Sequence, residues 1–135
     1  MPMKTKLFLL AIIVIFLSGC QIQTDSRKKI QDLEFLVVEE GKVPEKLSQV
    51  LEEKKAEPFK LTYQDQGNLY LCSGYGKQPT GGYSIGVEEL YLTENAIYFD
   101  TILIGPSKGE ILAETPSYPY IVVMTEDLDL PVVFQ

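Results

Sequence analysis

A series of short β-rich stretches separated by turn residues constrains the fold of this chain more than any other feature. In residues 59–63, every second residue is Phe, Leu or Tyr, as expected for a strand with one buried face. The turn signal Asp-Gln-Gly-Asn at residues 65–68 then predicts a hairpin with residues 69–73. Further strands, two of them joined as a hairpin around residues 93–95, are predicted at residues 33–38, 83–87, 89–92, 96–104, 110–114, 120–124 and 131–134.

One segment follows a helical pattern instead. Val43, Leu47 and Leu51 lie on one apolar stripe at helical spacing. Pro44 suits the first position of a helix, where its missing N–H costs nothing. We therefore expect a surface helix near residues 44–55 that packs on a sheet.

The chain has 135 residues, which allow one domain, here residues 33–135, after a short leader. Seven or eight short strands with Gly and Pro between them indicate a sandwich or a partly closed barrel. The predicted fold class is therefore mostly β with one helix. It is either a small β-sandwich, of which the immunoglobulin-like fold is one form, or a partly open barrel.

The first 20 residues follow the pattern of an export signal. Lys4 and Lys6 precede an apolar run of 11 residues at 7–17. Such a run spans about 16 Å as a helix, which is too short for a hydrocarbon core of about 30 Å. Residues 1–19 are therefore predicted to be a signal peptide.

The run ends in Leu-Ser-Gly-Cys at residues 17–20, which resembles the bacterial lipobox. That resemblance implies that Cys20 carries acyl chains such as palmitate and becomes the new N-terminus. Residues 20–32 are then a flexible tether, and the domain is attached to a cell membrane, facing outside the cytoplasm. The sequence leaves open whether this is the plasma membrane or an outer membrane. With Cys20 lipidated, Cys72 has no partner within the chain, and its apolar neighbours predict a buried, inert thiol.

Composition excludes several classes of function. The formal net charge is −7, and removal of residues 1–19 leaves 10 basic and 19 acidic side chains, a charge of −9. Such a charge repels phosphate backbones, so we expect no nucleic acid partner. The chain has no histidine, which excludes Ser-His-Asp, Cys-His and His-metal sites within it. We predict that the protein is not an enzyme and holds no metal or cofactor.

The segment Gly-Lys-Gln-Pro-Thr-Gly-Gly-Tyr-Ser-Ile at residues 76–85 joins two predicted strands. Pro79 fixes its own φ, Thr80 can bond local backbone, and Gly81 and Gly82 allow conformations that other residues avoid. With Tyr83 at its exit, this segment is either a recognition loop on a rigid scaffold or a tight β-connection whose glycines only satisfy turn geometry.

A second segment has a similar composition. Tyr118, Pro119 and Tyr120 place two aromatic rings around a proline at the start of an apolar strand. Exposed tyrosines suit protein binding because they offer a large contact area at a small entropy cost. Core packing explains one of these two tyrosines equally well, so the segment is a candidate part of a binding site.

These two segments resemble the C-terminal domain of the PrcB family, whose namesake is a lipoprotein subunit of a bacterial surface protease complex. The resemblance covers roughly residues 69–134, and the string Pro-Thr-Gly-Gly-Tyr is its most specific part. It implies a non-catalytic role in which the domain binds or stabilises a partner protein, plausibly a secreted protease, as an accessory subunit.

The string Gln-Pro-Thr-Gly-Gly-Tyr at residues 78–83 is also similar to the Asn-Pro-Thr-Thr-Gly-Tyr loop of chagasin-type cysteine-protease inhibitors, which are immunoglobulin-like. Residues 118–120 loosely match their Arg-Pro-Trp loop, without its Arg and Trp. This resemblance implies a protease inhibitor as an alternative function. A third hypothesis is a cell-wall or small-molecule binding module that uses a stacking surface of tyrosines, namely Tyr75, Tyr83, Tyr118 and Tyr120.

Overall fold

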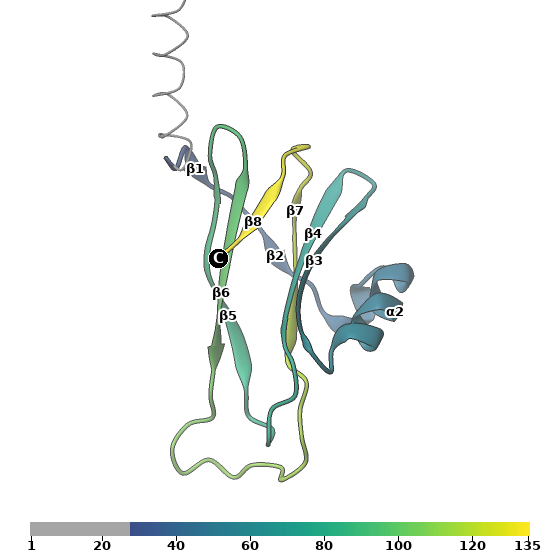
Figure 1. Cartoon of the computed structure of the whole chain (residues 1–135), viewed down its shortest axis with the longest axis vertical. Coiled ribbons are helices and arrows are strands. Elements are labelled where there is room, and N and C mark those ends of the chain that lie inside the picture. The colour runs from purple at the N-terminus through teal and green to yellow at the C-terminus, as the bar shows by residue number, and fades with distance from the viewer. Residues whose placement is uncertain (1–27) are drawn as a thin grey trace, which may run out of the picture.

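A computed structural model describes residues 28–135, which form two packed β-sheets and one α-helix (Figure 1). The predicted signal peptide, Cys20 and most of the predicted tether lie outside the described residues. The elements are β1 (Gln31–Asp32), β2 (Leu36–Val37), the 3-10 helix η2 (Glu40–Lys42), α2 (Glu45–Lys54), β3 (Pro58–Asp65), β4 (Asn68–Tyr75), β5 (Ser84–Leu92), β6 (Ile97–Ile104), β7 (Tyr120–Glu126) and β8 (Val132–Phe134).

Each sheet has four strands. The strand order is β1-β5-β6-β8 in one sheet and β2-β7-β4-β3 in the other. All pairs are antiparallel except β6 with β8. The two sheets lie face to face and do not close into a barrel (Figure 1), so the mostly β prediction is confirmed in its sandwich form.

The main core lies between the two sheets. Alternation along each strand directs every second side chain inward, so Leu69 and Leu71 of β4 meet Phe99 of β6 in one buried cluster. Phe99 also packs edge-on against Phe134 of β8, with ring centroids 5.9 Å apart. The parallel strand β8 therefore completes the core.

The outer face of the β2-β7-β4-β3 sheet carries a second core under α2. Leu47 and Leu51 of the helix are buried against Tyr70, Cys72 and Val122. Strands β4 and β7 are therefore covered on both faces, which agrees with their mostly apolar sequences. The predicted helix is confirmed, one residue shorter at each end.

The N-terminal stretch differs from the single strand predicted at residues 33–38. Asp32 pairs with β5 in one sheet, whereas Leu36 pairs with β7 in the other. Between them the chain crosses the open side of the sandwich, and the Leu33 side chain packs against the core. One continuous strand cannot belong to both sheets, so the segment forms two short strands. The first of them begins two residues before the predicted domain start.

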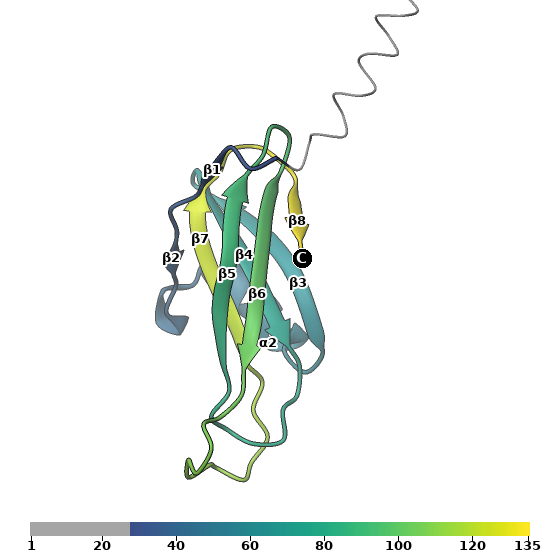
Figure 2. The same ribbon diagram turned by 90° about the vertical axis from the view of Figure 1, so that its left-hand side faces the viewer.

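The predicted strand at residues 110–114 is wrong, because this segment lies in an extended loop. That loop, residues 105–119, joins β6 to β7 at the same end of the sandwich as residues 76–83, which join β4 to β5 (Figures 1 and 2). We call them the second loop and the first loop, and together the loop end. The opposite end, here the hairpin end, holds β1 and the short turns at residues 66–67 and 93–96. Within residues 28–135 no helix is long and apolar enough to span a membrane.

Candidate functional site

The first loop and the second loop, which hold most of the two segments that the sequence singled out, are hydrogen-bonded to each other. Gln78 and Ser117 form an antiparallel bridge in which the Gln78 N–H donates to the Ser117 carbonyl at 2.8 Å and the Ser117 N–H donates to the Gln78 carbonyl at 3.0 Å. Farther out, the Gly81 N–H donates to the Ala113 carbonyl at 3.1 Å. The loop end is therefore one connected unit.

Side chains add to this connection. The Ser117 hydroxyl donates to the Thr80 carbonyl at 2.6 Å, and the Gln78 amide donates to the Tyr75 carbonyl at 3.1 Å. The Thr80 hydroxyl donates to the Gly81 carbonyl at 3.0 Å, which is the local backbone bond expected of it. Pro79 remains exposed on the outside of the bridge. These bonds hold the first loop in one shape and leave its proline accessible.

Gly82 is required where the loops approach most closely. Its φ is +86°, a conformation that L-residues rarely adopt. A Cβ at this position would lie 2.7 Å from Cδ2 of Leu112 and 2.9 Å from Cβ of Pro106, both in the second loop. The glycine therefore serves contact between the loops as well as turn geometry.

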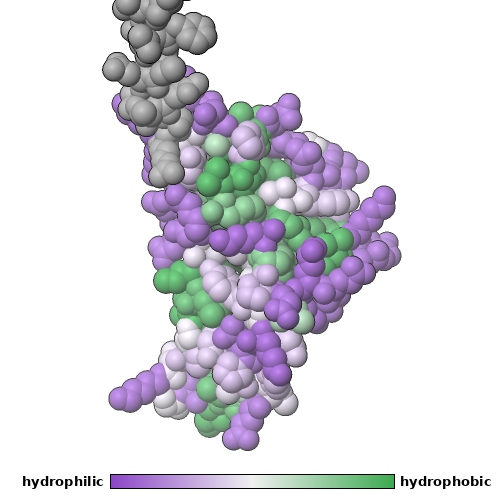
Figure 3. All heavy atoms as spheres, in the orientation of Figure 1, coloured by the Kyte–Doolittle hydropathy of each residue, from purple (hydrophilic) through white to green (hydrophobic). Residues whose placement is uncertain are grey.

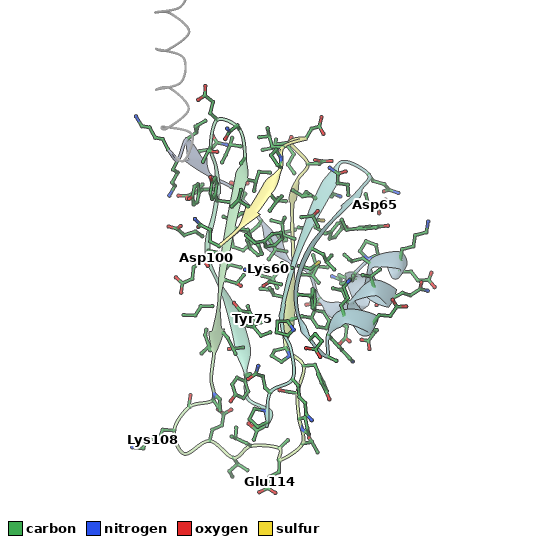
Figure 4. The ribbon with its side chains drawn as sticks, in the orientation of Figure 1. Lys60, Asp65, Tyr75, Asp100, Lys108 and Glu114 are labelled. Atoms are coloured by element: carbon green, nitrogen blue, oxygen red, sulfur yellow. The ribbon has the colours of Figure 1, made fainter. Side chains whose placement is uncertain are left out.

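A short chain of hydroxyl groups joins the two sheets directly above the loops. The Tyr75 hydroxyl at the end of β4 lies 2.6 Å from the Thr101 hydroxyl on β6, which donates to the Ser73 hydroxyl at 3.3 Å. Figure 4 shows Tyr75 between the sheets. This contact fixes the spacing of the strands from which both loops start.

The tyrosines at the loop end do not form a single stacking surface. Tyr75 lies between the sheets, whereas Tyr120 packs on the opposite face of the same sheet, 6.3 Å from the Phe59 ring centroid. Tyr83 is half-buried beside Gly105. Tyr118 keeps 37% of its surface exposed, with the Lys55 Nζ 5.9 Å from its ring centroid. The arrangement does not provide the single stacking surface on which the cell-wall or small-molecule binding hypothesis relied.

The tip of the second loop carries an apolar residue that sequence reasoning placed in a strand. Ile111 is 99% exposed, and Figure 3 shows apolar surface at the tip of the loop end with polar surface around it. Lys108 and Glu114 of the same loop point outward into solvent (Figure 4). The sequence did contain an indication that Ile111 is exposed, because it directly follows Gly109 and Glu110 in a polar loop. Single exposed apolar residues are ordinary, but one at the tip of a protruding loop can insert into a partner.

The described residues hold little reactive chemistry. Cys72 is completely buried under α2, and this burial raises the pKa of its thiol to about 12, so the thiolate nucleophile is absent at neutral pH. Within residues 28–135 no group of three or more Cys, His, Asp or Glu side chains could hold a metal ion. Nine lysines and 18 acidic side chains give these residues a formal charge of −9.

One family model matches the part of the chain that contains both loops. Residues 69–126, which run from β4 to β7 and include both loops, match the family model described as PrcB C-terminal. No curated protein and no solved structure matches the chain. The matched segment contains all eight residues of the two candidate binding segments, namely Pro79, Thr80, Gly81, Gly82, Tyr83, Tyr118, Pro119 and Tyr120.

Proposed function

Because residues 69–126 of this chain carry a PrcB C-terminal domain, we propose that the protein is a non-catalytic subunit that binds a protease complex through its loop end. It is anchored outside the cytoplasm by lipid on Cys20, in the plasma membrane or an outer membrane. The partner carries out catalysis, and this chain binds or stabilises that partner.

The mutual fixation of the two loops is the observation that carries this proposal. Residues nearly 40 positions apart are joined by the Gln78–Ser117 bridge and by the bond from Ser117 to Thr80, where the sequence separation is 37. Binding a partner with preformed loops costs less conformational entropy than ordering flexible ones. Exposed Pro79, Tyr118 and Ile111 then supply contact area on a rigid support.

The position of β1, the first described strand, suits an anchored subunit. Strand β1 lies at the hairpin end, opposite the two loops (Figure 1). A lipid attached upstream of residue 28 would therefore leave the loop end directed away from the bilayer. The negative charge of the domain adds repulsion from anionic headgroups, which keeps the domain away from the bilayer surface.

Capture of the partner tests the proposal. Full-length protein is purified from detergent-solubilised membranes as wild type, as Gly82→Asp and as Gly67→Asp. Both glycines have positive φ, but a side chain at Gly82 meets the second loop, whereas nothing lies within 4 Å of one at Gly67. We expect a protease to co-purify with wild type and Gly67→Asp and to be lost with Gly82→Asp. Equal recovery of the protease from both variants, or its absence from wild type, contradicts the proposal.

Lipidation and catalysis have separate tests. Mass spectrometry of the mature N-terminus is expected to find acyl chains on Cys20, and Cys20→Ser is expected to move the protein out of the membrane fraction. Peptide hydrolysis is expected only when the partner is present. An unmodified thiol at Cys20 would contradict the anchor, and hydrolysis by the chain expressed alone would contradict the non-catalytic role.

A chagasin-like inhibitor is the second candidate, favoured by the finding that the residue 78–83 loop and the residue 117–120 segment meet at one end of a sandwich. Titration of the purified protein against papain-like proteases separates the two functions. Inhibition that is lost in Gly82→Asp would favour the inhibitor. Absence of inhibition at micromolar protein would remove it and leave the subunit role intact.

A further inference from the structure

A free sheet edge lies beside the first half of β7. Strand β2 pairs with β7 through Leu36 opposite Met124 and Val37 opposite Val123, and the Val38 N–H donates to the Val122 carbonyl at 2.8 Å. The chain then turns away into η2 and α2. Figure 2 shows β2 beside only the upper part of β7. The lower part of β7 therefore has a neighbour on one side only.

Strand alternation determines which backbone groups this edge presents. Main-chain N–H and C=O groups of residues two apart point to the same side of a strand. Because Val122 faces β2, Tyr120 directs its N–H and C=O to that same side, where β2 has already ended. The main-chain groups of the residues in between point toward β4 instead. The bond from the Tyr75 N–H to the Pro119 carbonyl at 3.1 Å shows this for Pro119. Tyr120 thus offers a donor and an acceptor on an open edge.

A groove of about 390 Å³ runs along this edge. It is lined by the end of the second loop and the start of β7, from Tyr118 to Val122, and by Val37 of β2 and Val43 before α2. Because Val38 already pairs with Val122, the open edge runs over residues 118–121, which at about 3.3 Å per residue suits a short extended segment. The groove therefore combines an unpaired strand edge with apolar walls, which is the arrangement used in recognition by strand addition.

The charged side chains around the groove indicate which charge a bound segment should carry. Glu40, Glu52 and Lys55 lie at its rim. Lys55 is paired with Glu52 at 2.7 Å, and among residues 28–135 Glu40 forms no ion pair. Burial is the main cause that raises the pKa of the Tyr120 hydroxyl, and Glu40 and Glu52 add to this rise while Lys55 opposes it. A basic side chain placed here would find Glu40 as its partner.

We propose that this groove binds an extended, basic segment of a partner protein as an added strand, paired with Tyr120 of β7 and with its basic side chain beside Glu40. The inference rests on the proposed function for the partner, whose segment this is, but it uses a surface beside the loop end. The negative charge of the whole domain favours the same choice of a basic segment.

The test uses full-length protein in detergent micelles, labelled with nitrogen-15, and three synthetic five-residue probes. These are Val-Lys-Val-Lys-Val with blocked ends, its Val-Glu-Val-Glu-Val counterpart, and the lysine peptide with N-methylated backbone. We expect the lysine peptide to shift the amide signals of Tyr120 and Val122 and to slow hydrogen exchange at Tyr120. The glutamate and N-methylated peptides are expected to have no such effect, because one is repelled and the other cannot pair with the edge.

Charge reversal supplies the matched variants. Glu40→Lys is expected to weaken binding of the lysine peptide about two- to fivefold, the range of an exposed ion pair. Glu89→Lys on the other sheet changes the net charge equally and should leave binding unchanged. Equal binding of the lysine and glutamate peptides, or shifts confined to other strands, would overturn the proposal. So would a wild-type dimer in sedimentation equilibrium that Glu40→Lys dissociates, because a second copy would then cover the edge.

Failure of this inference is separable from failure of the proposed function. Ile111→Ser changes the tip of the loop end and should leave peptide binding unchanged. Peptide binding without protease capture supports the groove and contradicts the subunit role. Protease capture without peptide binding supports the subunit role and contradicts the groove.

Discussion

The two ends of the sandwich use glycine at positive φ in different ways. At the hairpin end, Gln66 and Gly67 have φ of +51° and +80°, and the space around Gly67 is open. This is a two-residue turn between β3 and β4, which needs positive φ at both positions. At the loop end, Gly82 has φ of +86° and is packed against Leu112 and Pro106. Turn geometry accounts for the first glycine, whereas contact between distant segments accounts for the second.

The hydrogen bonds show the same contrast. Thr93 closes its turn locally, with its N–H donating to the Ala96 carbonyl at 2.9 Å and its hydroxyl accepting from the Ala96 N–H at 3.2 Å. The Ser117 hydroxyl instead bonds to Thr80, 37 residues away. A local turn can form as soon as its hairpin does, but the loop end requires both sheets to be in place first. The loop end therefore takes its shape only when the sandwich is assembled.

Replacement of the two glycines by alanine gives the largest expected difference in stability between the ends. Gly67→Ala should lower the free energy of unfolding by about 1–2 kcal/mol, the cost of a left-handed L-residue. Gly82→Ala adds overpacking against Leu112 and Pro106, for a total of about 2–5 kcal/mol. Urea unfolding measures both. Equal losses would mean that Gly82 only satisfies a turn.

This contrast also sets the limit of prediction from sequence. The turn at residues 65–68, the hairpin around it and the helix near residues 44–55 were predictable because local composition determines them. Residues 76–83 and 118–120 were identified as candidate binding segments, but residues 110–114 of the second loop were assigned to a strand, and the bridge between Gln78 and Ser117 was not predicted. Main-chain bonds between distant segments leave no pattern in a single sequence.

Two further differences come from tertiary packing. The apolar segment at residues 110–114 has strand composition, yet Leu112 covers Gly82 and Ile111 points into solvent. In β5 the register shifts between Val87 and Glu89. This β-bulge leaves both Glu88 and Glu89 exposed, where strict alternation predicts that they face opposite sides, and it returns Leu90 to the core.

The second prediction concerns the bond that joins the loops. Ser117→Ala removes the donor to the Thr80 carbonyl and should lower the free energy of unfolding by about 1 kcal/mol. Amide exchange at Gln78 should become faster, because the bridge beside it loosens. Ser107→Ala is the matched control, since this serine is exposed in the same loop and should change stability by less than about 0.5 kcal/mol. Indistinguishable exchange in the two variants would argue against a connected loop end.

The third prediction is a substitution that stabilises the turn at the hairpin end. Gln66 is a non-glycine residue at φ of +51°, and asparagine tolerates this conformation better. Gln66→Asn should therefore raise the free energy of unfolding by about 0.5 kcal/mol, a part of the roughly 1–2 kcal/mol cost of the left-handed conformation. The midpoint of urea unfolding should rise, and protease capture should stay unchanged. A loss of capture would show that the two ends are coupled.

The last prediction has the smallest effect on stability and the clearest consequence for function. Ile111 is 99% exposed, so Ile111→Ser should change the free energy of unfolding by less than about 0.5 kcal/mol. If this side chain inserts into the partner, capture should nevertheless fall, because a buried apolar anchor contributes strongly to an interface. Ile102→Ser on the outer face of β6 removes a comparable exposed side chain away from both loops, and capture should be retained. Retained capture by Ile111→Ser together with loss in Gly82→Asp would restrict the contact surface to the first loop and Tyr118.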